Sequence, residues 1–104
     1  MKKKAKKHLG DYHQYLIHSL KNPKEAKAYL NAALEEDNPE DFLIALRNVV
    51  EAHGVSKTAR LAGLNRVSFY RMLSKKGNPS LASLYALLRA LGFSFRVDRA
   101  KKAA

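Results

Sequence analysis

Cationic and hydrogen-bonding side chains gather in one short segment, Val55–Ser74, with the sequence VSKTARLAGLNRVSFYRMLS. Two helical patterns meet in it at Gly63, and each has an inward-facing set of small or apolar residues. The inward sets are Thr58, Ala59 and Ala62 before the turn, and Phe69, Met72 and Leu73 after it. Glycine can take positive φ at a corner, and Leu64 can fill the space beneath the turn. The segment is therefore interpreted as a helix-turn-helix.

The second helix of this pair, expected at about residues 66–73, has outward side chains suited to base recognition. Arginine can form paired hydrogen bonds with guanine, asparagine can pair with adenine or contact a phosphate, and apolar or aromatic groups can contact a thymine methyl. Nearby lysines can contact phosphates. The candidate DNA-binding residues are Lys57, Asn65, Arg66, Val67, Ser68, Tyr70, Arg71, Lys75 and Lys76. The alternative is an ordinary helical turn, but the spacing, the helix lengths and the charge all favour DNA binding.

The distribution of charge supports this interpretation. The net charge of +11 and the pI of about 10.1 favour a polyanionic partner. Residues 55–76 carry six Lys or Arg and no acid, whereas residues 9–54 carry eight of the nine acidic residues. One face for DNA and another for a basic partner is the simplest interpretation. Acidic residues on helices can equally be ordinary solvated surface.

Length and composition limit the class of protein. A chain of 104 residues that is 46% hydrophobic suits a single domain with a modest core. Without cysteine, a long apolar run or a signal-peptide segment, the chain is expected to be cytoplasmic. We expect no enzymatic activity, cofactor or metal site, because the four histidines lack the spacing of paired metal ligands and no cysteine can complete a site.

The remaining pattern predicts helices before and after the basic segment. Apolar periodicity predicts helices at about residues 11–20, 23–36 and 39–53, with Asn22-Pro23 and Asn38-Pro39 as start signals. A last helix is capped by Ser80 or Asn78 and ends at Gly92. Its apolar stripe is Leu81, Leu84, Leu87, Leu88 and Leu91. Residues 1–8 are predicted to be a flexible basic arm, which either follows DNA or only improves solubility.

The C-terminal segment changes to a period of two. Phe93, Phe95 and Val97 alternate with polar residues, which predicts a strand at residues 93–98. A lone strand leaves its backbone groups unpaired, so we expect it to pair with the same strand of a second copy or with the sheet edge of a partner protein. We thus predict one domain at residues 9–98, between the arm and a basic tail at residues 99–104.

Several blocks, in order over about residues 12–97, resemble a known family. They are Ala28–Glu35 followed by Asn38-Pro39, Gly54–Ala62, Gly63–Arg66, Phe69–Ser74, and Gly77–Leu81 with Leu84, Leu91 and Gly92. The chain resembles the small antitoxins with an Xre/HigA-like helix-turn-helix, often labelled probable addiction module antidote proteins. The resemblance implies an all-α, lambda-repressor-like DNA-binding domain of five or six helices, with the short C-terminal β-strand paired across a dimer.

The same resemblance implies a function. Family members neutralise a co-encoded toxin, typically a RelE/HigB-like ribosome-dependent ribonuclease, and repress their shared operon as dimers. The positions that match the family's DNA-facing sites are Asn65, Arg66, Val67, Tyr70 and Arg71. The lysine-rich start and Asn65, which stands where serine is more common, depart from the family pattern. Two alternatives stay open: a stand-alone phage-type or Xre-family regulator without a toxin, and a protein that coats nucleic acid without sequence specificity.

Overall fold

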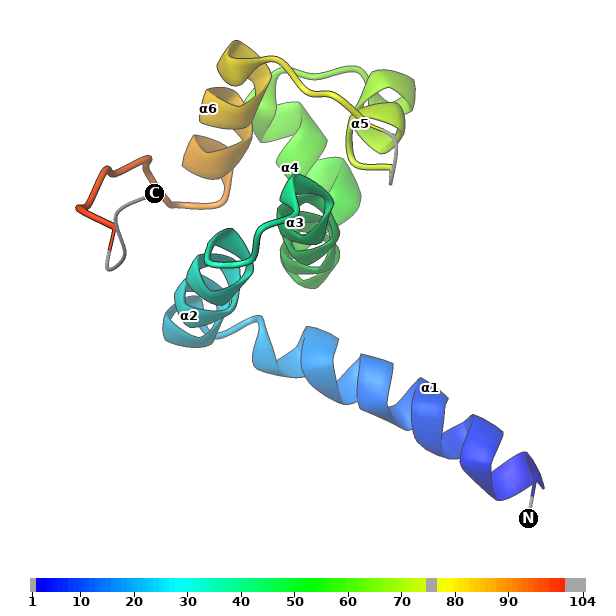
Figure 1. The fold of residues 1–104 in the computed structure, drawn as a ribbon. Helices are drawn as coiled ribbons and strands as arrows, with labels where there is room; N and C mark the ends of the chain where they lie inside the picture. The colour runs from blue at the N-terminus through cyan, green and yellow to red at the C-terminus, as the bar shows by residue number, and fades with distance from the viewer. Residues whose placement is uncertain (1, 75–76, 101–104) are drawn as a thin grey trace.

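The structure, a computed structural model, describes the backbone of residues 2–74 and 77–100 and the side chains of residues 10–74 and 77–100. Within these ranges all regular secondary structure is α-helical (Figure 1). The six helices described are α1 Lys2–Ser19, α2 Pro23–Leu34, α3 Pro39–His53, α4 Val55–Ala62, α5 Arg66–Met72 and α6 Leu81–Ala90. None of the helices described combines the length and the hydrophobicity needed to cross a membrane.

The helix starts follow the local chemistry of the sequence. The side-chain oxygen of Asn22 accepts a hydrogen bond from the backbone N–H of Lys24, and that of Asn38 accepts one from Glu40, both at 2.9 Å. A proline follows each asparagine in the first helical position, where its missing N–H costs nothing. Ser80 caps α6 through its hydroxyl, which accepts from the N–H of Ser83 at 3.1 Å. The predicted caps at Asn22, Asn38 and Ser80 are confirmed.

Helix α1 is longer than the sequence pattern predicted. It begins at Lys2 rather than near residue 11, so residues 2–8, which we predicted to be a flexible arm, form its first turns. Lysine and alanine favour helix formation, and adding residues to an existing helix costs far less than starting one. Figure 1 shows the N-terminal half of α1 extending away from the other helices.

Only the C-terminal part of α1 joins the core. Leu20 is buried and Leu16 packs against the core cluster, as their spacing predicted. Tyr12 and Tyr15, on the same helix, are 64% and 72% exposed. At this level α1 still contacts α3, because Nε2 of His13 lies 3.4 Å from Oε2 of Glu51, so the two tyrosines are exposed on a side of the helix that faces away from the core.

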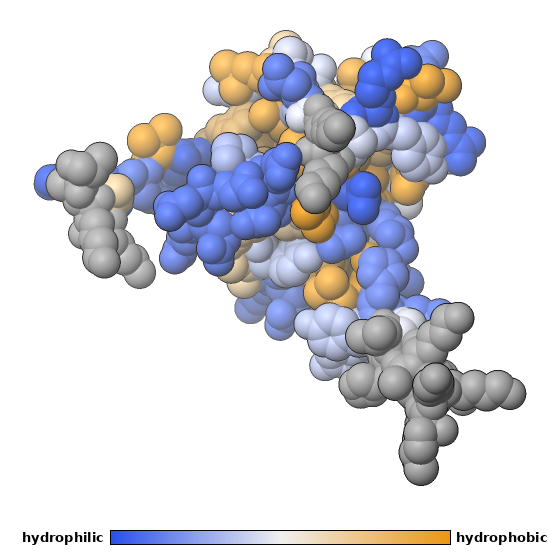
Figure 2. All heavy atoms as spheres, turned by 45° about the vertical axis from the view of Figure 1, so that its right-hand side comes forward, coloured by the Kyte–Doolittle hydropathy of each residue, from blue (hydrophilic) through white to orange (hydrophobic). Residues whose placement is uncertain are grey.

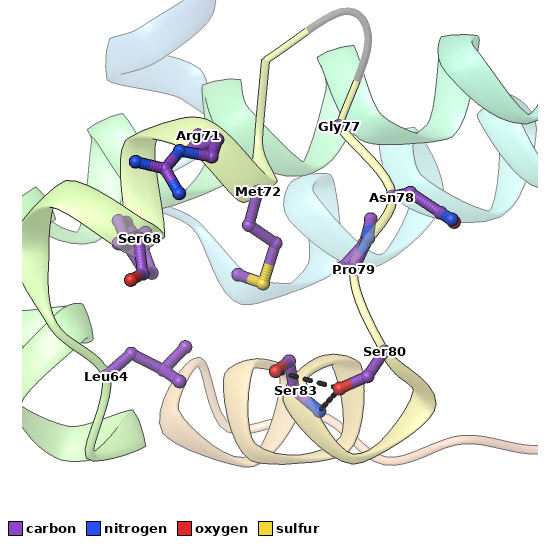
Figure 3. A pocket seen from close by; sticks show the side chains of 10 residues that line it. Leu64, Ser68, Arg71, Met72, Gly77, Asn78, Pro79, Ser80 and Ser83 are labelled. Atoms are coloured by element: carbon purple, nitrogen blue, oxygen red, sulfur yellow. Dashed lines mark hydrogen bonds between the residues drawn. The ribbon is translucent and has the colours of Figure 1, made fainter.

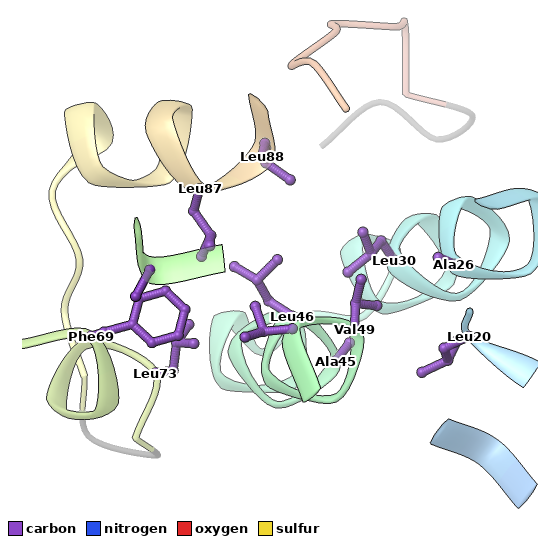
Figure 4. Close-up of a cluster of buried hydrophobic side chains, with 12 residues drawn as sticks. Leu20, Ala26, Leu30, Ala45, Leu46, Val49, Phe69, Leu73, Leu87 and Leu88 are labelled. Atoms are coloured by element: carbon purple, nitrogen blue, oxygen red, sulfur yellow. The ribbon is translucent and has the colours of Figure 1, made fainter. Parts of the chain in front are cut away.

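Helix α3 is the centre of the fold. It packs against α1, α2 and α4, while α6 packs against α4. Its buried residues are Leu43, Ala45, Leu46, Val49 and Val50. Figure 4 shows the cluster continuing from α2 and the end of α1 to Phe69, Leu73 and Leu87 near the basic segment. The core therefore supports both α5 and the acidic N-terminal half.

The C-terminal segment corrects one of our predictions. Residues 93–100 form no strand in the structure. After Gly92, with φ of 90°, the N–H of Phe93 donates to the carbonyl of Leu88 at 2.7 Å, and the Phe93 ring packs against the core. The ring of Phe95 lies 4.7 Å from that of Tyr85, while Val97 is 95% exposed. The alternating pattern thus reflects packing of two aromatic rings against helices, and strand pairing gives no basis for a dimer.

Candidate nucleic-acid interface

Helices α4 and α5 meet at a tight turn at Gly63. Its φ of 69° lies in the left-handed region that glycine adopts without strain. The N–H of Leu64 donates to the carbonyl of Ala59 at 2.9 Å, and that of Gly63 to Arg60 at 3.1 Å, which satisfies the last carbonyls of α4. The predicted pair of helices joined at Gly63 is confirmed.

Asn65 fixes the start of α5. Its side-chain oxygen accepts hydrogen bonds from the N–H groups of Val67 at 2.8 Å and Ser68 at 3.3 Å. Pairing with adenine uses the amide oxygen and nitrogen together, and the oxygen is already occupied. In this geometry Asn65 orients the helix and has only its amide N–H₂ left to donate to a phosphate or a base.

Helix α5 separates a buried side from an exposed side. Phe69 is only 1% exposed, and Leu73, just after the helix, is 3% exposed. The opposite side carries Val67 and Arg71 one turn apart, flanked by further exposed residues. The exposed positions of α5 are Arg66, Val67, Ser68, Tyr70 and Arg71. All five predicted α5 residues thus reach solvent from one short, anchored helix, and Arg66 and Arg71 make this side cationic.

One of the three predicted lysines, Lys57, lies within the described residues. Lys57 is exposed in the first turn of α4, about 9 Å along the helix axis from Gly63. Lys75 and Lys76 lie outside the described residues. Arg60, three residues after Lys57 and nearer the turn, is also exposed and extends the basic surface. It was absent from the predicted set although it stands in the same acid-free segment.

A hydrogen-bonded pair between α3 and α4 sets the position of the basic segment. The hydroxyl of Thr58, a fully buried residue, donates to the carbonyl of Gly54 at 2.6 Å. Its oxygen lies 2.7 Å from Nδ1 of His53 and accepts that N–H. Gly54, with φ of 114°, joins the two helices at this point. Both contacts join residues only four or five positions apart, yet the spacing of apolar residues gives no sign of them.

This pair predicts a dependence of stability on pH. Burial, and secondarily the positive charge of Lys57, lower the pKa of His53 below its ordinary value of 6.5. The unfolded chain therefore takes up a proton at His53 more readily than the folded chain does, so stability is lost as pH falls below about 6.5. Urea unfolding at the two pH values should show that the free energy of unfolding falls less from pH 7.5 to pH 5.5 in His53→Asn than in the unchanged protein. His18→Asn, at an exposed position, is the control. Equal losses in all three proteins would contradict the role of His53.

A pocket of about 350 Å³ lies between α5, the following loop and α6 (Figure 3). Met72 points from α5 towards α6, while Ser68, Asn78 and Ser83 add polar groups to the lining. Gly77 closes the loop against the end of α5, where a side chain would overlap the carbonyl of Met72. The structure shows that this close backbone approach requires a residue without Cβ.

The remaining described residues were compared with the donor sets that hold metal ions. No three His, Asp or Glu residues converge as metal ligands within the described ranges. Every buried side-chain nitrogen or oxygen described there has a hydrogen-bond partner. Figure 2 shows a face dominated by hydrophilic side chains, with hydrophobic ones in separate small patches. Among the described residues, the exposed side of α5 is the clearest arrangement suited to contacting nucleic acid.

One family model and one relative match most of the chain. A family model described as probable addiction module antidote protein matches residues 12–99. An uncharacterized protein of Haemophilus influenzae (strain ATCC 51907 / DSM 11121 / KW20 / Rd) is 38% identical over 82 residues, which covers 79% of this chain and 84% of that protein. No solved structure matches the chain. The family match includes α2 to α6 and leaves out the lysine-rich start of α1.

Proposed function

The chain belongs to the family of probable addiction module antidote proteins, and on that premise we propose that it is the antitoxin of a type II toxin-antitoxin module. In this role it represses its own operon by binding operator DNA and neutralises a co-encoded toxin. It acts by binding in the cytoplasm and has no enzymatic activity. The toxin we expect is a RelE/HigB-like ribonuclease, in keeping with the resemblance of the basic segment to Xre/HigA-like antitoxins.

The exposed side of α5 is the observation that carries the DNA-binding part of this proposal. Val67 is 65% exposed and Tyr70 is 53% exposed beside two arginines, on a helix whose other side is buried. These side chains suit a major groove, because it offers thymine methyl groups, guanine acceptors and phosphates within reach of one short helix. We propose that α5 is the recognition helix of a helix-turn-helix formed with α4.

A homodimer is part of the proposal, through a surface other than the predicted strand. Leu81, which we predicted to face the core, is 65% exposed, and Tyr85 lies one turn later at 48% exposed. The ring of Phe95 packs at a tilt against that of Tyr85 and extends this apolar stripe. A dimer that binds an operator through α5 needs its two copies of α5 to face half-sites about 34 Å apart. Light scattering should give the mass of two chains, and a single-chain mass at micromolar concentration would remove the dimer from the proposal.

Neutralisation of a toxin is tested in cells. The small reading frame next to the gene is expressed alone and together with this chain. We expect growth arrest in the first case and growth in the second. Arrest that persists despite expression of this folded chain would contradict the antitoxin role. Specific DNA binding without rescue would favour a stand-alone regulator.

A further inference from the structure

A groove between α2 and α3 has the shape and charge of a protein-binding site. It has a volume of about 280 Å³ and lies on helices that contribute nothing to the exposed side of α5. Three alanines leave room in it, and Ile44, 39% exposed, offers an apolar contact. The lining residues are Tyr29, Ala32, Ala33, Glu36, Asp41, Ile44 and Ala45. Figure 1 shows the two helices side by side.

The end of this groove is strongly acidic. The segment 35–41, which leads from α2 into α3, contains five carboxylates and no basic residue. Two salt bridges are present among the described residues, His13 with Glu51 and Arg96 with Asp98, and neither involves this segment. Within the described ranges these carboxylates therefore face solvent without a cationic partner. Phosphate groups would be repelled here, so the groove suits a cationic protein segment and not DNA.

Folding explains only part of this acidity. Glu40 and Asp41 lie in the first turn of α3, where the helix dipole favours negative charge. Glu35 and Glu36 follow the C-terminal end of α2, where the dipole of that helix disfavours negative charge, and the last turn of α2 has no basic residue. Local rules that are broken without structural benefit mark functional positions. Binding of a cationic protein segment at this end of α2 would explain why the acidic residues are placed there.

We propose that the groove between α2 and α3 binds a basic amphipathic segment of the toxin. An apolar side chain of that segment packs against Ile44 and the alanines, and flanking Lys or Arg side chains face Glu36 and Asp41. The inference rests on the proposed antitoxin function, because it assigns the surface that performs the neutralising contact. Since α5 is not part of the groove, this contact leaves the DNA-binding side of α5 uncovered.

The test uses the purified full chain and the protein encoded by the neighbouring small reading frame. Calorimetry gives the Kd for the unchanged chain, for Ile44→Glu, and for Glu36→Lys combined with Asp41→Lys. Both variants should bind the partner roughly tenfold or more weakly. Ile44→Glu keeps the acidic residues of the groove, so weaker binding by this variant reports the loss of the apolar contact. The matched control is Glu25→Lys, an exposed charge reversal on α2 about three turns from Glu36. Its affinity should stay unchanged.

Each other outcome overturns a defined statement. If the unchanged chain does not bind the partner, both the proposed antitoxin function and the proposed role of the groove are contradicted. If the unchanged chain binds and both groove variants bind equally well, the toxin binds elsewhere on the chain, and the antitoxin function stands. An equal loss of affinity in Glu25→Lys would also contradict binding at the groove, because a general effect of charge would then explain the weaker binding. A change of the groove variants from dimer to monomer would assign the surface to a second copy of the chain. Circular dichroism and operator binding should be unchanged in every variant.

Discussion

Replacing Phe69 by alanine is expected to lower the free energy of unfolding by about 3 to 5 kcal/mol. The ring is 1% exposed and lies near Leu73 and Leu87 in the core (Figure 4). Helix α5 has only seven residues, too few to be stable without tertiary packing. The Phe69 ring is thus the main anchor of the helix that we propose to read DNA. Operator binding should be lost together with stability.

Urea unfolding followed by circular dichroism measures this effect. Tyr70→Ala is the matched control, because it removes a neighbouring aromatic ring that is 53% exposed. Its stability should change by no more than about 0.5 kcal/mol. If Phe69→Ala proved as stable as Tyr70→Ala, the ring would not be the anchor of α5.

Replacing Arg71 by alanine should weaken operator binding by about 1 to 3 kcal/mol, or roughly five- to 150-fold, without lowering stability. The side chain is exposed on the side of α5 opposite the buried ring, so its loss leaves no cavity. An arginine here can form two hydrogen bonds with guanine, and its removal should relax the preference at one base pair. Binding to a set of operators with single base changes measures affinity and preference together.

Arg71→Lys separates base recognition from phosphate contact. Lysine keeps the charge but cannot reproduce the paired hydrogen bonds of a guanidinium group. If Arg71 reads a base, Arg71→Lys should lose preference almost as fully as Arg71→Ala does. If Arg71 contacts a phosphate, Arg71→Lys should bind nearly as well as the unchanged chain. An alanine variant with unchanged affinity and preference would contradict the assignment of α5 as the recognition helix.

Local signals in the sequence predicted most of the helical framework. Asn22 and Asn38 cap helices through hydrogen bonds to residues two positions later, and proline then fixes the first turn. Gly63 adopts the left-handed conformation that its place between two helical patterns required. Such interactions involve neighbours in the chain, so residue type and spacing determine them.

Features that depend on the rest of the fold were predicted poorly. The alternating pattern of residues 93–98 matches a strand, but Phe93 and Phe95 pack against helices instead. Periodicity placed Leu81 in the core, whereas it is exposed at the first position of α6. A hydrophobic pattern identifies a face of an element but not what lies against it.

The candidate site shows the same division. Periodicity correctly separated the buried Phe69 from the exposed Arg71. The use of the Asn65 side-chain oxygen within α5, the contact between His53 and Thr58, and the backbone approach of Gly77 could not be read from residue spacing. Each depends on distances between atoms that folding brings together, and these contacts hold α4, α5 and the loop after α5 in place.

Competition between specific and random DNA tests the central claim, that α5 reads an operator, most directly. The DNA upstream of the gene is titrated with the purified chain at a fixed, moderate salt concentration, against a shuffled fragment of the same length and composition. We predict binding to the upstream fragment that is at least about a thousandfold tighter than to the shuffled one. Equal affinity for both, falling together as salt rises, would contradict the account and assign the +11 charge to non-specific coating of nucleic acid.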